Sequence, residues 1–260
     1  MTSSSDKATY ISASYRFGSQ ATTTTSANVI WPVTGKIGPD YININSPQYV
    51  VGVAQGATDA ASSTGARAIV LQGLSGSLTL QQEQIWLNGT SPVTTSNQYV
   101  RVFRAWATKC GSNGTNASSV FVGYGTITSG VPASILCQIS AGRGQTTQIN
   151  QTVATSIVTH LHDMTFAIGR TGGGQDVLGT FTLRTRQITG VYGSYELGPW
   201  RDRIVADTIS TFNYQASEDE IIFYGPYDFE GRVLASGAAR ATCVIGGEFH
   251  KYIGNAVEFP

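Results

Sequence analysis

The sequence has 260 residues, enough for one large β domain or two small ones with a substantial core. Sixteen basic and sixteen acidic residues cancel, and charged residues make up 12% of the chain, about half of the usual ~25%. There is no basic excess for nucleic-acid binding, and no apolar run approaches the ~18 residues of a transmembrane helix.

Runs of β-branched and aromatic residues, separated by turn residues, recur at about the 8–12-residue spacing that is typical of sandwiches and barrels. No Pro/Ser linker and no internal repeat divides the chain, so we predict one continuous domain over residues 1–260, with a mobile arm at 1–7. Residues 82–87 and 148–158 also fit a helical turn or two. The strands are expected, in chain order, at 9–17, 28–31, 41–44, 49–54, 65–74, 78–87, 99–108, 119–128, 133–139, 154–170, 176–186, 204–212, 220–225 and 232–249.

The stretch Gly65–Thr108 carries the strongest local signal and predicts three successive antiparallel strands. Its Asn88-Gly89 pair suits a tight hairpin turn, because both residue types tolerate positive φ. Trp86, Phe103 and Trp106 lie on these strands, and we expect them in the core or in a buried interface.

Several short motifs follow one another in fixed order. They are Gly65-Ala-Arg, Gln72-Gly-Leu, Leu87-Asn-Gly-Thr with Val93-Thr-Thr, Tyr99-Val-Arg-Val-Phe-Arg-Ala and Gly111-Ser-Asn-Gly-Thr-Asn-Ala, with Pro199-Trp200 and Ser217-Glu-Asp-Glu-Ile-Ile further on. Their order resembles a family of virion-associated proteins of tailed phages of aquatic bacteria and of large DNA viruses of algae. The resemblance is best between about residues 50 and 125, and it implies a particle component without fixing which one.

Antiparallel strands in this number must close or double over to hide their edges, so we predict an all-β, single-domain, two-sheet β-sandwich of the jelly-roll type. The choice of a jelly roll rests partly on analogy, since capsid proteins of viruses use that fold often.

His160, His162 and Asp163 form the one metal-like cluster of the sequence. On a strand, His160 and His162 would share a face, as in the His-x-His motif of cupin enzymes. Phe166 and Ala167 stand where a ligand Glu would be needed, so surface or interface histidines are the favoured interpretation and no metal or cofactor is expected.

No other pattern supports catalysis. Gly172-Gly-Gly lacks the Lys and helix of a phosphate loop and is predicted to form a hairpin turn. There is no Gly-x-Ser-x-Gly elbow, and the acidic run 218–220 is read as a solvated turn. We therefore expect no catalytic residues and no enzyme.

The three cysteines, Cys110, Cys137 and Cys243, lack metal-site spacing and are expected to be buried thiols, with a Cys110–Cys137 bridge as the open alternative. The N-terminus lacks the regions of a signal peptide.

Low charge and abundant aromatics favour a protein that acts through its surfaces. We predict a structural virion protein, penton-like or a minor capsid protein, made in the host cytoplasm and located in the capsid. Its expected partners are itself, as a homo-oligomer such as a pentamer, and other capsid proteins. The alternative is a host-attachment or glycan-binding spike or fibre module that uses exposed Trp and Tyr.

Overall fold

The computed structural model describes residues 8–22, 27–33, 36–171, 176–191, 193–215 and 221–252, and every regular element in these ranges is a β-strand. The predicted all-β class is confirmed, and the suggested helical turns at 82–87 and 148–158 are wrong: both stretches contain strands instead. None of the described residues belongs to a helix long and apolar enough to cross a membrane. The expected arm 1–7 and the C-terminal residues 253–260 lie outside the described ranges.

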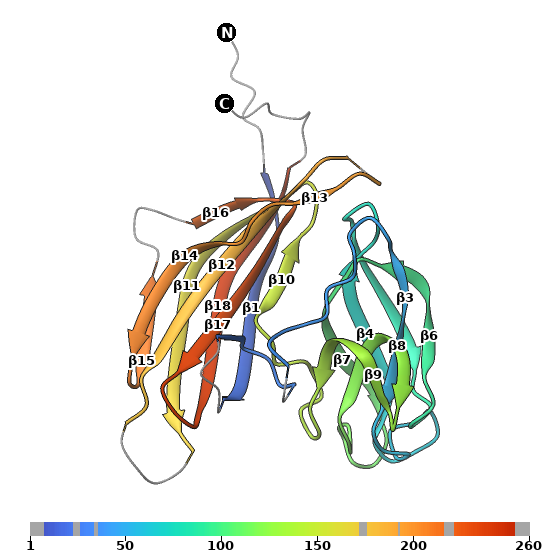
Figure 1. Cartoon of the computed structure of the whole chain (residues 1–260). Helices are drawn as coiled ribbons and strands as arrows, with labels where there is room; N and C mark the ends of the chain where they lie inside the picture. Colours follow the sequence, from blue (N-terminus) through green and yellow to red (C-terminus); the bar gives the residue numbers. More distant parts are fainter. Residues whose placement is uncertain are drawn as a thin grey trace.

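The strands form two groups that stand side by side (Figure 1). We call the group that contains the first and last strands the terminal half. Its strands are β1 (Ala8–Thr22), β2 (Asn28–Val29), β10 (Asn150–Val153), β11 (Ile157–Arg170), β12 (Gly179–Thr189), β13 (Glu196–Leu197), β14 (Arg201–Thr208), β15 (Thr211–Gln215), β16 (Ile221–Tyr224), β17 (Tyr227–Ala235) and β18 (Ala239–Tyr252).

The terminal half contains two sheets. The five-stranded sheet has the order β1-β18-β11-β15, with β16 also paired to β11. The six-stranded sheet has the order β10-β17-β12-β13, with β14 paired to β12 and β2 paired to β17. All of these pairings are antiparallel.

The core of the terminal half lies between its two sheets. Buried and less buried residues alternate along most of β12, as expected of a strand with one face on a core. Phe181 from β12 meets Phe166 from β11 with ring centroids 4.8 Å apart, and Phe229 from β17 belongs to the same cluster. Each of these side chains contributes about 1.5–3 kcal/mol by leaving water.

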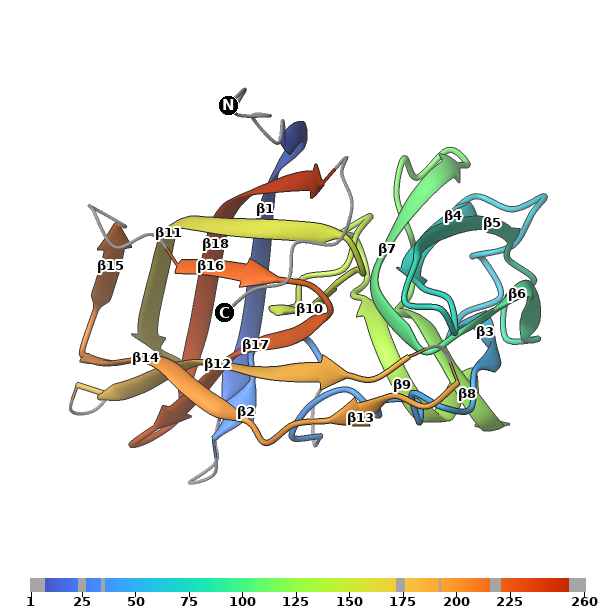
Figure 2. The same cartoon turned by 90° about the horizontal axis from the view of Figure 1, so that it is seen from above.

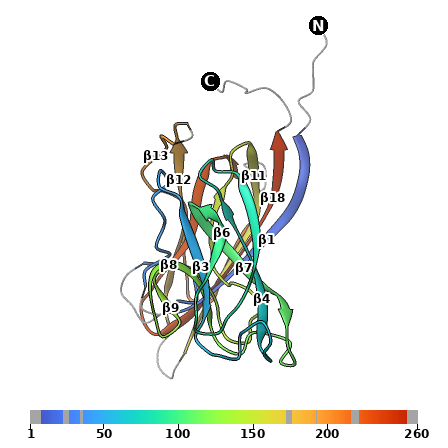
Figure 3. The ribbon, with the colours of Figure 1, turned by 90° about the vertical axis from the view of Figure 1, so that its right-hand side faces the viewer.

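The strands between β2 and β10 in sequence form the second group, which we call the inserted half. Two sheets build it, with the orders β6-β3-β8-β9 and β5-β4-β7. Figure 2 shows β4 and β5 on the opposite side of this half from β8 and β9, and Figure 3 looks onto this half with the terminal half behind it. Its strands are β3 (Gln48–Ala54), β4 (Ala66–Leu74), β5 (Leu80–Trp86), β6 (Val93–Tyr99), β7 (Arg101–Cys110), β8 (Val120–Thr128) and β9 (Val131–Ile139).

The inserted half has its own apolar cluster, in which Ile69 and Leu71 of β4 meet Val50, Val122 and Leu136. Smaller clusters join strands of both halves: one holds Phe103 of β7 together with Ile188 of β12. The expectation that residues 1–260 act as one domain stays a prediction.

The chain leaves the terminal half for the inserted half, and returns from it, at one place. The Ile30 N–H donates to the Gly231 carbonyl, the Gly231 N–H to the Ile149 carbonyl, and the Ile149 N–H to the Ile30 carbonyl, each over 2.9 Å. A Cβ on Gly231 would lie 2.7 Å from a methyl carbon of Ile149, so only glycine allows this close approach. Residues 30 and 149 therefore lie next to each other, although more than a hundred residues separate them in sequence.

The stretch Gly65–Thr108 differs from its prediction. It holds four strands: β5 and β7 both pair with β4, whereas β6 pairs with β3 in the other sheet. A turn does occur at Asn88, whose carbonyl accepts from the Ser91 N–H over 3.1 Å, and Gly89 has φ +59°. This turn carries the chain from one sheet to the other, so the predicted hairpin is wrong.

One strand and one turn assignment also need correction. Residues 41–44 form no strand and belong to the irregular connection between β2 and β3. The predicted hairpin turn 172–174 lies outside the described residues, but β11 and β12 on either side of it belong to different sheets, so they form no hairpin.

Candidate functional site

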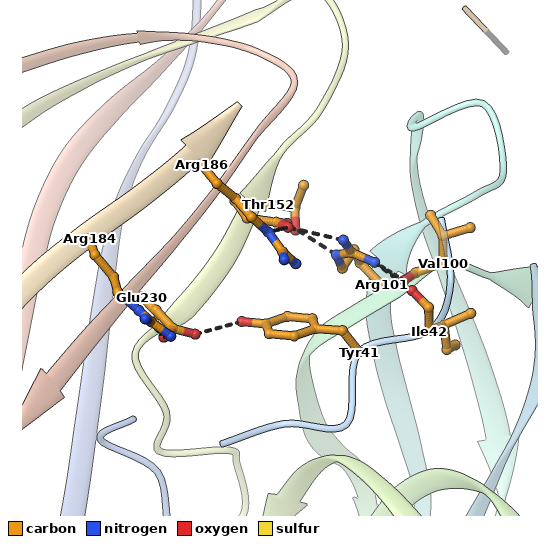
Figure 4. A network of polar contacts seen from close by, with 9 residues as sticks. Tyr41, Ile42, Val100, Arg101, Thr152, Arg184, Arg186 and Glu230 are labelled. Carbon is orange, nitrogen blue, oxygen red and sulfur yellow. Dashed lines mark hydrogen bonds and ion pairs between the residues drawn. The ribbon is translucent and has the colours of Figure 1, made fainter. Parts of the chain in front are cut away.

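Charged side chains gather where the two halves meet (Figure 4). We call this set the arginine–carboxylate network. It consists of Tyr41, Arg101, Thr152, Arg184, Arg186, Asp228, Glu230 and Arg232.

Strand register places most of the network. Arg184 and Arg186 on β12 lie directly opposite Glu230 and Asp228 on β17. Because alternate residues of a strand share a face, both cross-strand pairs lie on the same side of the sheet. The sequence builds this face with two short alternating patterns, Arg-Thr-Arg on one strand and Asp-Phe-Glu on the next.

Arg101 reaches this face from the inserted half. It is the first residue of β7, its side chain is 2% exposed, and its Nε and Nη2 donate to the two oxygens of Asp228 over 3.1 and 3.0 Å. Its Nη1 donates to the backbone carbonyls of Ile42 and Val100 over 2.9 and 2.7 Å. This bidentate geometry is the strong form of an arginine–carboxylate contact.

Asp228 is fully enclosed. Besides Arg101, it accepts from Arg186 Nε over 2.7 Å and from the Thr152 hydroxyl. Burial alone would raise the pKa of Asp228, but the charges and hydrogen bonds of Arg101, the charge of Arg186 and the hydrogen bond from Thr152 outweigh it, so the pKa is lowered. Asp228 is therefore a carboxylate held in its charged form.

Glu230 on β17 makes the second contact, with Tyr41 in the connection between β2 and β3. The Tyr41 hydroxyl donates to one of its oxygens over 3.1 Å, and the other oxygen is hydrogen-bonded by Arg184. Arg232 Nε lies 3.2 Å from that same oxygen, close enough for an ion pair although the geometry makes no hydrogen bond. Burial, and then the charges of Glu230 and Asp228, raise the pKa of Tyr41, so this hydroxyl stays a donor.

Aromatic rings lie over three of the guanidinium groups. Arg184 and Arg186 each lie 4.4 Å from the ring centroid of Trp200, and Arg101 and Arg186 lie 5.0 and 5.1 Å from that of Tyr41. Such cation–π contacts are worth about 0.5–2 kcal/mol, more when they are desolvated.

The network links the two halves of the protein. Each carboxylate is engaged by two or more donors, and Arg101 and Tyr41 attach the inserted half and its connecting segment to β17. Beside the network lies a small cavity of about 90 Å³, lined among others by Arg186, Arg201 and Arg203. This volume holds only a few water molecules.

A second buried carboxylate fixes one end of the inserted half. Asp59, 0% exposed, accepts from the Ala66 and Ala117 N–H groups over 2.7 and 2.8 Å, and from the Ser118 N–H and hydroxyl over 2.7 and 2.6 Å. The motif residues Gly65-Ala66-Arg67 and Gly111–Ala117 thus meet around this one side chain. Part of the motif order is explained by this structural role.

His160, His162 and Asp163, the one metal-like cluster of the sequence, lie on β11. A register shift between Leu161 and Asp163 interrupts the alternation on which a shared face for His160 and His162 depended. No group of three or more His, Cys, Asp or Glu side chains suited to a metal occurs among the residues described. The acidic run 218–220 lies outside the described residues.

The cysteines are free thiols: Cys137 and Cys243 are buried, Cys110 is partly buried, and the alternative Cys110–Cys137 bridge is not formed. Burial raises the pKa of both Cys137 and Cys243. Such thiols are inert compared with exposed ones.

The tryptophans divide between core and surface. Phe103 is 3% exposed, as predicted, and Trp31 is fully buried. Trp106 is half-buried with Arg104 over its ring, 4.9 Å from the centroid, and Trp86 is 49% exposed. A core position is therefore wrong for Trp86, which ends the edge strand β5 on the face turned away from the core. A buried interface, the other alternative, stays a prediction for Trp86.

Sequence reasoning missed the arginine–carboxylate network. Its one signal was the placement of charges at alternate positions of two strands, Arg184 and Arg186, and Asp228, Glu230 and Arg232, in a chain with few charges. Charged residues rarely occupy such positions unless they are paired.

No family model and no curated protein matches the sequence. Among solved structures, the chain is similar to the structure of infectious bursal disease virus Gt strain, with 9% identity and a TM-score of 0.24 over 98% of this chain and 76% of that one. The Gx strain gives 7% identity and a TM-score of 0.21 over 96% and 75%. The crystal structure of the VP2 subviral particle of the same virus gives 8% and 0.13 over 96% and 82%. TM-scores this low establish no common fold.

Proposed function

We propose that the protein is a non-enzymatic structural component of a virus particle, built on a jelly roll in its terminal half. In a jelly roll, eight strands are divided between two sheets so that the first and last strands are neighbours and the chain forms two Greek keys. The strand order of the terminal half supports this assignment, and it is the observation that carries the proposal.

Eight strands of the terminal half support the comparison with a jelly roll: β1, β18, β11 and β15 in one sheet, and β10, β17, β12 and β14 in the other. The last strand, β18, lies between β1 and β11, and the strand before it, β17, lies between β10 and β12 in the facing sheet. The chain crosses from sheet to sheet between β10 and β11, between β11 and β12, and again between β14 and β15. The virion role follows from the association of this fold with capsids and from the motif resemblance, both of which are arguments by analogy.

The terminal half also offers surface for self-association. Among the described residues of this half, seven large apolar side chains are exposed, including Val205 on β14 at 58% and Ile209 just after it at 61%. Among the described strands, β12 is the one to which β14 is paired. Apolar side chains beside an open strand edge suit contact with another subunit. We propose a homo-oligomer, penton-like or part of the minor capsid, within the virion.

Quantitative mass spectrometry and immunogold labelling of purified particles test this proposal directly. We expect the protein in particles at a copy number that matches a symmetry-related set of positions. Sedimentation of the recombinant protein should show a closed oligomer that survives from about 50 mM to about 1 M salt, because apolar burial is not screened. Absence from particles, or a monomer at physiological concentration, would reject the proposal.

A further inference from the structure

The outer face of the sheet β5-β4-β7 carries a group of aromatic and amide side chains. The core face of this sheet is formed by residues such as Ile69, Leu71 and Ile85. The residues between them in sequence point the other way, away from the core. On this outer face we find Trp86, Gln82 and Gln84 from β5, Val70 and Gln72 from β4, and Arg104, Trp106, Thr108 and Lys109 from β7. Thr108 and Lys109 share this face because a register shift makes Thr108 an extra residue, whose hydroxyl contacts Gln84, while Lys109 lies opposite Ala68.

Strand register arranges these side chains in rows. One row runs from Gln82 through Gln72 to Arg104, and the next from Gln84 through Val70 to Trp106. Gln145 extends the second row, because it forms a β-bridge with Trp106. In the third row Ala68 lies between Trp86 and Lys109.

Several side chains of this surface are exposed in the part of the chain that the structure describes. Trp86 is 49% exposed, and Gln82, Gln84 and Gln145 are exposed as well. Because two strand spacings and two residues of rise separate Trp86 from Trp106, their Cα atoms are about 12 Å apart. That distance spans a short oligosaccharide.

The charges on this face have one sign. Arg104 and Lys109 are its ionic groups, and the one acidic residue of the three strands, Glu83, lies on the opposite face, where its carboxylate accepts from the Ser96 and Asn97 N–H groups over 2.5 and 3.0 Å. Arg104 is already oriented by stacking on Trp106 at 4.9 Å. A guanidinium held in this way matches a carboxylate in charge and in geometry.

We propose that the outer face of β5-β4-β7 binds acidic oligosaccharides, those whose sugar rings bear carboxylates. Trp86 stacks on a sugar ring, the glutamine amides exchange hydrogen bonds with hydroxyl groups, and Arg104 and Lys109 hold the carboxylates. The glutamine amides distinguish this ligand from a partner protein, because the buried core of a protein–protein interface is more apolar than this surface. This inference does not depend on the proposed virion role, because the protein could be a particle component whether or not it binds oligosaccharides.

The test is titration calorimetry with a galacturonic acid hexamer, with cellohexaose as the neutral probe. We expect the acidic hexamer to bind, the neutral one to bind at least tenfold more weakly, and Trp86→Ala or Arg104→Gln to reduce affinity for the acidic hexamer by tenfold or more. Trp86→Phe should retain most of the affinity. Tyr49→Ala is the matched control, because Tyr49 is 54% exposed but lies on β3 in the other sheet.

Since Trp86 is exposed at the end of an edge strand, its replacement should leave the melting temperature unchanged, so lost binding cannot be ascribed to unfolding. Failure of the acidic hexamer to bind at millimolar concentration would overturn the proposal. So would equal binding of the neutral probe, or an affinity that Trp86→Ala does not alter. Tight binding of a single-stranded thymidine oligonucleotide that depends on Trp86 would identify a nucleic-acid face instead.

Discussion

Replacing Arg101 with methionine should separate the stabilities of the two halves. Methionine keeps much of the side-chain length and its apolar contacts, but it removes two hydrogen bonds to Asp228 and two to the carbonyls of Ile42 and Val100. Asp228 would keep Arg186 and Thr152 as partners. Removing one member of a buried ion pair costs about 3–5 kcal/mol, because the other charge stays desolvated.

The assay is differential scanning calorimetry. In a chain of this size, 1 kcal/mol shifts the melting temperature by about 2–4 °C, so Arg101→Met should lower it by roughly 6–20 °C. If residues 1–260 behave as one domain, the wild type should unfold in one transition, and the variant should show two as the halves uncouple. Arg143→Gln is the matched control, because Arg143 is exposed in the loop after β9.

A double-mutant cycle with Asp228→Asn isolates the pair, and we expect a coupling energy of about 1–3 kcal/mol. The pH dependence gives an independent check. The folded pKa of Asp228 is lowered, so its stabilisation is present above its unfolded pKa of about 3.9 and is lost as the pH falls through the folded value. The stability difference between wild type and Asp228→Asn should therefore shrink as the pH falls below about 4. An unchanged melting temperature in Arg101→Met, or a coupling energy near zero, would refute this reasoning.

Three other substitutions test the packing. Asp59→Asn should lower the free energy of unfolding in urea by about 2–4 kcal/mol, because an amide group replaces a carboxylate oxygen that accepts hydrogen bonds; an effect no larger than that of Ser118→Ala would contradict this. Gly89→Val should destabilise by about 1–3 kcal/mol through strain at φ +59° and contact with Ala57, and by more than Gly114→Val, which is strained at φ +69° in open space. Trp31→Ala should cost about 3–5 kcal/mol by leaving a cavity, and Trp106→Ala clearly less, since Trp106 is half-buried; equal losses in thermal unfolding would disprove the difference.

Local pattern was enough to predict most of the strands. β12 follows the alternation of Phe181 and Leu183 with polar residues, and the polar loops on either side of β8 and β9 occur where turn residues cluster. These features depend on the period of a strand and on the backbone preferences of turn residues, both of which act over a few neighbouring positions.

Local sequence patterns could not predict which strands and which charged side chains pair with each other. β6 follows β5 in sequence but pairs with β3, because the turn at Gly89 crosses between sheets rather than closing a hairpin. Arg101 and Asp228 are 127 residues apart, and neither neighbourhood reveals the other. The strand alternation at Trp86 was visible, but the side of β5 that faces the core depends on the position of the facing sheet.

The adjacency of Ile30 and Ile149 on either side of Gly231 has an evolutionary consequence. A segment whose two ends meet at one point on its host can be exchanged, shortened or lost by recombination while the host sheet keeps its register. The arginine–carboxylate network limits that freedom. A replacement segment without a cation at the position of Arg101 would leave the buried charge of Asp228 with one ion-pair partner fewer. In related genomes we therefore expect the segment to diverge faster than its surroundings, and the identities of residues 101 and 228 to change together.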